Sequence, residues 1–168
     1  MCEAIDFIRG CAPKAIILGC GVPLWPVFGR VEYCRIGCDM GLDWNDKLYM
    51  RAFHRERVST RNSILNSLFM RGIDGYAFGN DPDVFLLRDY NIELTDTQKL
   101  LLAKVNALCG TVLFTSDDVS TYDAEKKAKY KEALGYSAAK ILDVRIDQNV
   151  VTIEYVLNDQ SEKMQFSI

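Results

Sequence analysis

Short apolar runs and longer helix-forming stretches alternate along most of the chain. Four short runs rich in apolar and β-branched residues, each followed by Gly, Asn or Asp, are predicted to be buried strands at residues 15–21, 32–38, 75–79 and 111–116. Helix-forming stretches fall around them, at residues 3–12, 56–71, 95–109 and 123–134. Repeated alternation of strand and helix predicts an α/β fold in which parallel strands are joined by right-handed crossovers.

Two of the predicted helices carry clear boundary and packing signals. Thr95 and Gln98 have the spacing of a capping box, and Gly110 ends that helix. Its predicted core face holds Leu101, Val105, Leu108 and Cys109. The helix at 56–71 is ended by Gly72, and its predicted core face holds Val58, Ile64, Leu65, Leu68 and Phe69. Both helices are therefore expected to pack one apolar side on the sheet.

The pattern changes to period two from Lys140 onward. Three alternating segments are separated by turn signals at residues 148–149 and 158–159. This pattern predicts a small antiparallel β segment after the α/β body. We therefore expect two regions, residues 1–137 and residues 138–168, with the boundary near residue 137.

Composition and charge exclude several classes of protein. The 168 residues are 49% hydrophobic and 26% charged, and the net charge of −3 comes from 23 acidic and 20 basic residues spread along the chain. Such a balance gives no footprint for a nucleic acid partner. Glu3 and Asp6 stand where an export signal needs positive and apolar residues, and the longest apolar run is broken by prolines. The expectation is a soluble, cytoplasmic chain with no membrane contact.

Cysteine and histidine usage predicts no metal or other cofactor. The six cysteines lack the paired spacing of a zinc site, and in a chain without an export signal they are expected to be free thiols. The single histidine, His54, lies beside arginines and is expected at the surface.

The predicted strand ends carry acidic residues. Carboxyl ends of parallel strands meet on one rim, where reactive groups of α/β proteins gather. Asp39, Asp83 and Asp118 follow three of the four strands. An isolated strand-end aspartate is more often a turn residue, but three on one rim favour a hydrolase or a metal-dependent enzyme. An open flavodoxin-like domain with an acidic rim is an alternative, and it predicts stabilisation by Mg²⁺.

The four strand ends, taken in order, resemble a known family. The segments "LGCGVPLWP", "RIGCD", "NDPDV" and "LFTSDD" are similar to the second half of the catalytic barrel of α-galactosidases, the melibiase clan of retaining glycoside hydrolases. The resemblance covers residues 3–135. It implies a partial (β/α)8 (TIM) barrel of about four strand–helix units, followed by the start of the clan's C-terminal β-sandwich.

The resemblance also implies roles for individual residues. Asp39 falls at the position of the clan's general acid/base, and Arg35 and Asp83 fall at positions that bind the sugar. The loop after the first strand would shape the substrate pocket through Cys20, Gly21, Leu24 and Trp25. Several relatives have a larger polar residue at the position of Gly21, so galactose, an N-acetylated sugar and another hexose all stay open as substrates. The motif "PLWP" has a plainer alternative, a rigid aromatic loop packed on the core.

One expected residue has no counterpart in the sequence. A retaining glycosidase needs a nucleophile in addition to the acid/base. The clan's nucleophile follows the fourth barrel strand in a Lys-x-Asp pattern, and no such pattern precedes Cys20. The prediction is half of an α-galactosidase site, with an α-galactoside as ligand and no turnover by the chain alone. Association with a second copy or with a complementing N-terminal half-barrel is expected; a non-catalytic remnant or assembly module is the alternative.

Overall fold

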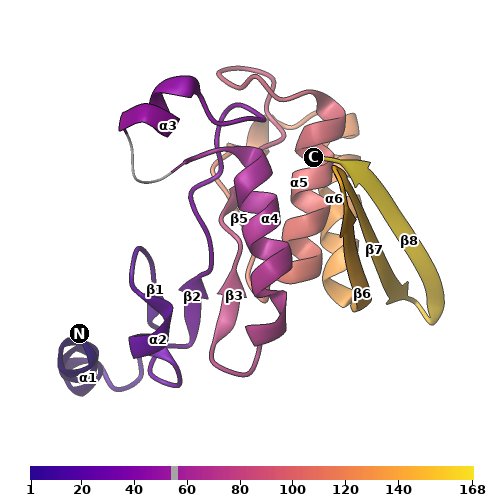
Figure 1. The fold of residues 1–168 in the computed structure, drawn as a ribbon. Coiled ribbons are helices and arrows are strands. Elements are labelled where there is room, and N and C mark those ends of the chain that lie inside the picture. The colour runs from indigo at the N-terminus through magenta and orange to yellow at the C-terminus, as the bar shows by residue number, and fades with distance from the viewer. Residues whose placement is uncertain (54–56) are drawn as a thin grey trace.

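The computed structural model describes residues 1–53 and 57–168, so the predicted surface position of His54 lies outside the described residues. The helices are α1 (Cys2–Cys11), α2 (Leu24–Val27), α3 (Leu48–Phe53), α4 (Thr60–Met70), α5 (Asp96–Cys109) and α6 (Ala124–Gly135). The strands are β1 (Leu18–Gly19), β2 (Tyr33–Arg35), β3 (Gly79–Asp81), β4 (Val84–Phe85), β5 (Phe114–Thr115), β6 (Lys140–Asp147), β7 (Val150–Leu157) and β8 (Gln160–Ser167). Figure 1 shows their arrangement.

The first five strands form two parallel ladders that share one bent segment. The order β1-β2-β3 is parallel throughout, and β4 pairs in parallel with β5. Only Pro82 and Asp83 separate β3 from β4. The chain therefore pairs with β2 before these two residues and with β5 after them. The predicted α/β alternation with parallel strands is confirmed.

The third predicted strand lies a few residues later than the sequence pattern suggested. Residues 75–78 form a tight turn instead, in which the Gly75 amide donates to the Phe78 carbonyl at 2.9 Å and Gly75 has a positive φ of 72°. The strand itself is Gly79–Asp81. The polar side chains of Asn80 and Asp81 are fully buried there. Asn80 Nδ2 donates to the Met70 and Cys109 carbonyls and Asp81 pairs with Arg35, so polar residues occupy a strand that an apolar pattern could not reveal.

The predicted core face of α4 is confirmed for Ile64 and Leu68, which are buried, and is wrong for Phe69. Leu65 is half-buried and Phe69 is 69% exposed, while the buried face holds Thr60, Ser63, Ile64, Ser67 and Leu68. The small hydroxyl side chains account for this. Ser63 Oγ donates to the Pro82 carbonyl at 3.4 Å, so the serine side of the helix meets the β3–β4 segment.

Helix α5 is the central helix of the core, and its predicted start is confirmed. Thr95 Oγ1 accepts from the Gln98 amide, and Gln98 Oε1 accepts from the Thr95 amide. Three of the four residues predicted for its core face, namely Val105, Leu108 and Cys109, are buried, and Leu101 is half-buried.

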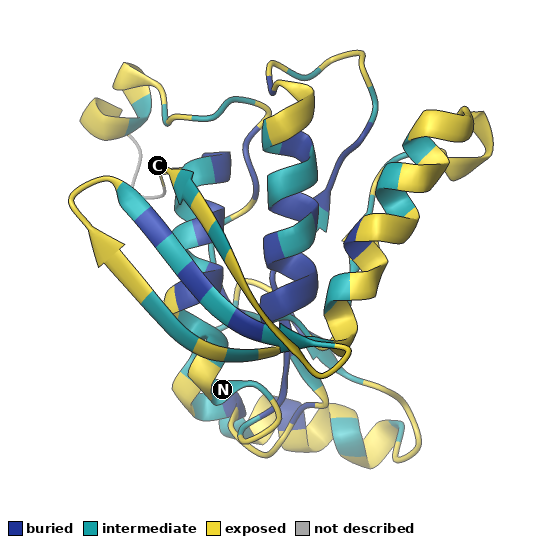
Figure 2. Cartoon of the chain, turned by 90° about the vertical axis from the view of Figure 1, so that its right-hand side faces the viewer, coloured by how far each residue is buried: buried dark blue, intermediate teal, exposed yellow. Residues whose placement is uncertain are grey.

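The antiparallel sheet β6-β7-β8 packs on the helices of the α/β body. The turns at 148–149 and 158–159 lie where the sequence predicted them. Val151, Ile153 and Tyr155 alternate along the buried side of β7 (Figure 2) and join the core cluster that contains α5. The chain enters this sheet through the 3₁₀ turn Tyr136–Ala138, and the Tyr136 and Tyr155 rings lie 5.7 Å apart. The sheet therefore shares its hydrophobic core with the α/β body.

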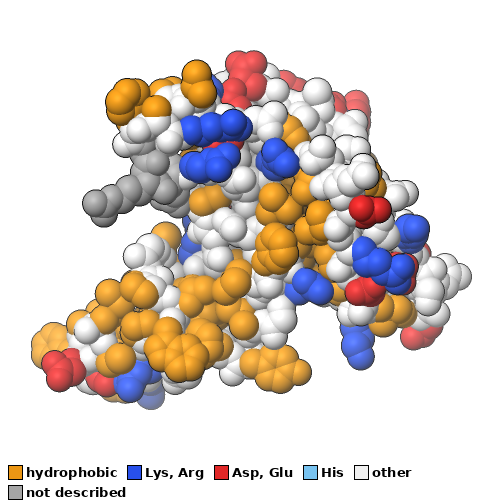
Figure 3. All heavy atoms as spheres, viewed as in Figure 1, with side chains coloured by type: hydrophobic (Ala, Val, Ile, Leu, Met, Phe, Trp, Pro, Cys, Tyr) orange, Lys and Arg blue, Asp and Glu red, His pale blue; other side chains and the backbone are white. Residues whose placement is uncertain are grey.

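A second, smaller core lies under α1 and α2. It contains Ile5, Val27, Val31, Cys34, Ile36 and Phe78. Hydrophobic side chains remain exposed on the surface of this N-terminal part (Figure 3), and Phe7 and Trp25 are 73% and 81% exposed. No helix among the described residues has the length and apolar character needed to cross a membrane.

Candidate active site

Arg35 is the centre of a charged cluster at the carboxyl end of β2. The parallel register places Arg35 opposite Asp81 of β3. Arg35 Nε donates to Asp81 Oδ2 at 2.9 Å, and Arg35 Nη1 lies 2.6 Å from Asp83 Oδ1 and 3.2 Å from Asp39 Oδ1. One guanidinium thus contacts three carboxylates, supplied by the ends of two neighbouring strands. We call Arg35, Asp39, Asp81 and Asp83 the Arg35 cluster.

Asp83 is held in an unusual backbone conformation. Its φ of 84° lies in the left-handed region, which costs on the order of 1–3 kcal/mol for a residue other than glycine. The Asp83 amide donates to Asp81 Oδ1 at 2.9 Å, and the Asp83 carbonyl accepts from Asn106 Nδ2 at 3.0 Å. Asp83 Oδ2 also accepts from the Met40 amide at 2.5 Å. Buried contacts from three segments therefore hold Asp83 in this conformation.

The surroundings of the Arg35 cluster shift the pKa values of two of its members. Burial raises the pKa of Asp83 above its ordinary value, and the charge of Asp39 adds to this effect, although hydrogen bonds from the Met40 and Val84 amides and the charge of Arg35 oppose it. Burial works to lower the pKa of Arg35, but the charges of Asp83 and Asp81 outweigh it and raise that pKa. Arg35 therefore stays charged, and a raised carboxyl pKa beside it is typical of acid/base sites.

Asp39 differs from the other two carboxylates in its exposure. It lies in the loop after β2, its side chain is 69% exposed, and it bonds to Arg35. The side chains of Asp81 and Asp83 are only 0% and 7% exposed. Asp39 is thus the most accessible carboxylate of the cluster, Asp83 keeps a small exposed area, and Asp81 has none.

The structure brings only part of the predicted pocket loop to the Arg35 cluster. Cys20 and Gly21 directly follow β1, and Cys20 lies close enough to act electrostatically on Arg35. Leu24 instead packs on the N-terminal core. The Trp25 ring lies 5.3 Å from the Phe28 ring, which in turn lies 5.6 Å from Phe78, just before the amino end of β3. Trp25 thus contacts Phe28 but is 81% exposed, so the ring lies at the surface and is not packed on the core.

The predicted position of Asp118 on the acidic rim does not join it to the Arg35 cluster. Asp118 Oδ1 accepts from the Ser120 amide and hydroxyl, which lowers its pKa and caps the turn Val119–Thr121. Its neighbour Asp117 is the buried residue. Asp117 Oδ2 accepts from the Leu87 and Arg88 amides and from the Tyr122 hydroxyl. Both aspartates therefore have structural roles in the loop after β5.

Sequence reasoning missed two members of this site. Asp81 was visible in the motif "NDPD" but had no assigned role, and its bond to Arg35 spans 46 positions of the sequence. Asn106 lies among apolar residues of α5 and had no signal at all. Its partner Asp83 is 23 positions away, so only the folded chain reveals the contact.

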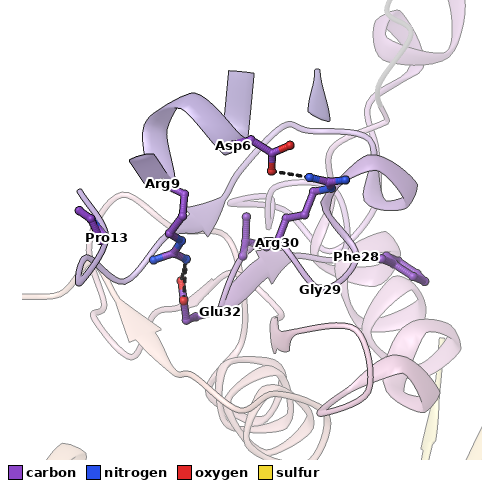
Figure 4. Close-up of a pocket in the computed structure, with 8 residues that line it drawn as sticks. Asp6, Arg9, Pro13, Phe28, Gly29, Arg30 and Glu32 are labelled. Carbon is purple, nitrogen blue, oxygen red and sulfur yellow. Dashed lines mark hydrogen bonds and ion pairs between the residues drawn. The ribbon is translucent and has the colours of Figure 1, made fainter. Parts of the chain in front are cut away.

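A cavity of about 570 Å³ lies away from the Arg35 cluster, beside the amino end of β2 (Figure 4). Its charged residues are paired with one another. Arg9 Nη2 lies 2.6 Å from Glu32 Oε1, and Arg30 pairs with Asp6. Among the described residues, no group of histidine, cysteine, aspartate and glutamate side chains could hold a metal ion.

Solved structures share this architecture. An α-galactosidase from Thermus thermophilus, in complex with p-nitrophenyl α-D-galactopyranoside, matches 95% of this chain with a TM-score of 0.67 and 22% identity. The fold is similar to part of an α-galactosidase. The same enzyme in complex with stachyose matches 79% of this chain with a TM-score of 0.65 and 24% identity. No protein-family profile matches the sequence.

A fungal α-galactosidase gives a weaker match of the same kind. α-Galactosidase I from Mortierella vinacea matches 80% of this chain with a TM-score of 0.51 and 14% identity. The chain spans only 32%, 29% and 40% of the three matched chains. The resemblance to α-galactosidases that the strand ends indicated is thus confirmed for the fold, over about a third of those chains.

Proposed function

We propose that the chain is part of a glycoside hydrolase of α-galactosidase type, which cleaves terminal α-galactosides with retention of configuration. The observation that carries this proposal is the Arg35 cluster. One guanidinium contacts an exposed carboxylate, Asp39, and a buried carboxylate of raised pKa, Asp83. Support comes from the fold, which is similar to part of α-galactosidases and is expected to be a partial (β/α)8 barrel.

In this proposal Asp39 is the general acid/base. Its exposed side chain protonates the glycosidic oxygen as the bond breaks, and the resulting carboxylate then deprotonates the water that resolves the covalent intermediate. Arg35 Nη1 contacts both Asp39 and Asp83, so one nitrogen holds the exposed and the buried carboxylate close to each other. Asp83 retains lone pairs beyond those used by Met40 and Arg35, so it can accept hydrogen bonds from sugar hydroxyls.

The nucleophile would come from outside the segment with this fold. A retaining enzyme places its two carboxylates about 5–5.5 Å apart. In the Arg35 cluster, Asp81 and Asp83 are buried and bonded to Arg35, which leaves them poorly suited to attack a sugar. We infer that a complementing half-barrel supplies the missing group.

The space beside Gly21 favours a second candidate substrate. Among the described residues, and apart from the two chain neighbours of Gly21, no atom lies within 4 Å of the point where a Cβ would stand on Gly21. A loop this open could accept the acetamido group of an N-acetylated sugar, which corresponds to α-N-acetylgalactosaminidase-type specificity. A non-catalytic remnant or assembly module would instead bind neither sugar.

Sugar binding by the 168-residue chain tests the proposed function. We expect methyl α-D-galactoside to shift NMR resonances of Arg35 and Asp83, and methyl α-D-glucoside to shift them less. Asp83→Asn should weaken binding by roughly tenfold, because it removes a charged acceptor worth about 1.5–3 kcal/mol. The matched control is Asp118→Asn, which alters an exposed turn aspartate and should leave binding unchanged. Equal binding by both variants would remove the support for a sugar site at the Arg35 cluster.

Turnover gives a separate test of the missing nucleophile. The purified chain is expected to release no chromophore from an aryl α-galactoside. Release that is abolished by Asp39→Asn would show that the chain holds a complete catalytic pair.

A further inference from the structure

We propose that Asn106 of α5, together with Asp81 of β3, is a positioning residue that fixes the carboxylate of Asp83. Neither side chain would touch the sugar, because both are fully buried. The part of this proposal that concerns substrate rests on the proposed function. The part that concerns Asp83 geometry stands on contacts within the chain.

The side chains of Asp81 and Asn106 bond to the backbone amide and the backbone carbonyl of Asp83. Asp81 Oδ1 accepts from the amide of Asp83 at 2.9 Å, and Asn106 Nδ2 donates to the carbonyl of Asp83 at 3.0 Å. Asp83 stands between β3 and β4, where the chain changes its pairing from β2 to β5. The backbone amide and carbonyl of Asp83 therefore bond to the side chains of Asp81 and Asn106, and not to the backbone of a neighbouring strand.

The backbone of Asp83 needs such anchors because its φ is 84°. An aspartate released from them would gain free energy by moving to an ordinary negative φ. That rotation would swing its carboxylate away from Arg35 Nη1 and from the Met40 amide, which lie 2.6 and 2.5 Å from its oxygens. The anchors thus determine where the carboxylate meets a ligand.

Asn106 is otherwise hard to explain at its place in the fold. It is fully buried on a helix whose other buried residues are mostly apolar. Its Oδ1 has no hydrogen-bond partner among the described residues. The bond to the Asp83 carbonyl is therefore the specific contact that an asparagine makes there and a leucine of similar size cannot make.

The chain offers a matched control in Asn80. Asn80 is also fully buried, and its Oδ1 likewise has no partner among the described residues. Its side-chain Nδ2 donates to the carbonyls of Met70 and Cys109 at 3.2 and 3.3 Å, and not to Asp83. Asn80→Leu therefore removes two side-chain hydrogen bonds and Asn106→Leu removes one, but only the second releases Asp83.

The experiment compares these two variants by NMR, with the Asp83 ¹³Cα and carbonyl shifts as one readout and affinity for methyl α-D-galactoside as the other. Both variants are expected to unfold at lower urea concentration than the unmodified chain. Only Asn106→Leu should move the Asp83 shifts toward values for negative φ, and only Asn106→Leu should weaken sugar binding, by roughly tenfold. Such a separation would support a positioning role, since loss of stability alone would affect both variants alike.

Unchanged Asp83 shifts in a folded Asn106→Leu variant would overturn the proposal. If the unmodified chain binds no galactoside, the proposed function fails, and the Asp83 shifts still decide whether Asn106 positions this residue. If Asn106→Leu does not fold, the side-chain amide of Asn106 in the unmodified chain decides the question. Slow exchange of these protons with solvent and a scalar coupling to the Asp83 carbonyl would support the proposal, whereas fast exchange would contradict it.

Discussion

Two charged clusters of this molecule differ in how deeply their carboxylates are buried. The Arg35 cluster gathers three carboxylates around one cation. The second, which we call the Lys99 cluster, joins the loop after β4 to α5 and α6 through Lys99, Lys126, Lys129, Asp89, Asp96, Asp123 and Glu125. Its carboxylates are 60–74% exposed, whereas two carboxylates of the Arg35 cluster are almost fully buried.

The difference separates a stabilising network from a candidate site. Lys99 is buried, but its ammonium group is fully served by Asp89, Asp96 and the Arg88 carbonyl. Ion pairs with exposed carboxylates are screened by water and each contribute little. The Arg35 cluster instead combines buried negative charge, a raised carboxyl pKa and a strained backbone at Asp83. Such costly features persist where function requires them.

Removing the central cation should have the largest effect in the Arg35 cluster. Arg35→Met leaves the carboxylates of Asp81 and Asp83 buried without a counter-charge, so we expect the free energy of unfolding to fall by about 3–5 kcal/mol at neutral pH. Urea unfolding followed by circular dichroism measures this loss. The loss should shrink in acid, because protonation of Asp83, whose pKa is raised, removes part of the buried negative charge. A loss of equal size at all pH values would mean that packing, not charge, is responsible.

The equivalent change in the Lys99 cluster should cost less. Lys99→Met removes a buried ammonium, but Asp89 and Asp96 are 61% and 60% exposed and can be hydrated. We expect a loss of about 1–2 kcal/mol in the same urea experiment. A loss as large as that of Arg35→Met would erase the distinction between the clusters.

The two clusters should also respond to pH with opposite signs. The pKa of Asp83 is raised from 3.8, so its protonated form stabilises the fold and this contribution is lost as pH rises through the folded pKa. Hydrogen bonds from Lys99 and Lys129 lower the pKa of Asp96 to about 2, so its contribution is present above the unfolded pKa and is lost as pH falls toward that value.

Asparagine variants isolate each contribution. As pH rises from about 3 to 7, the stability of the unmodified chain relative to Asp83→Asn should fall. Over the acidic part of that range, its stability relative to Asp96→Asn should rise, by a modest amount because Asp96 is exposed. Urea unfolding at several pH values measures both differences. If both differences rise or both fall with pH, the proposed contrast between the two clusters is wrong.

Asp39→Asn should have the smallest effect on stability. Its side chain is 69% exposed and its contact with Arg35 is the longest in the cluster, at 3.2 Å. We expect a change below about 0.5 kcal/mol in thermal or urea unfolding. A larger loss would make Asp39 a structural residue and weaken its assignment as acid/base.

Local patterns predicted the fold well wherever neighbours in sequence decide the structure. The capping box at Thr95 and the two turns of the antiparallel sheet depend on residues a few positions apart, and both predictions are confirmed. Prediction was wrong for Phe69 and for the third strand. In these cases polar side chains are buried against distant partners, which an apolar pattern cannot show.

Only the part of the candidate site that lies in strand-end motifs could be predicted from the sequence. Arg35, Asp39 and Asp83 belong to motifs at strand ends, and the structure brings them together. Asp81 and Asn106 act through buried bonds to residues 46 and 23 positions away. Their chemistry depends on which strand lies beside which, and that information is present only in the folded chain.

A structure of the chain with methyl α-D-galactoside bound tests the central claim most directly. We expect sugar hydroxyls within hydrogen-bond distance of Asp83 and Arg35, with the glycosidic oxygen facing Asp39. A galactoside bound elsewhere, for instance on the exposed ring of Trp25, with the Arg35 cluster empty at saturating sugar, would contradict the claim that this cluster is the substrate site.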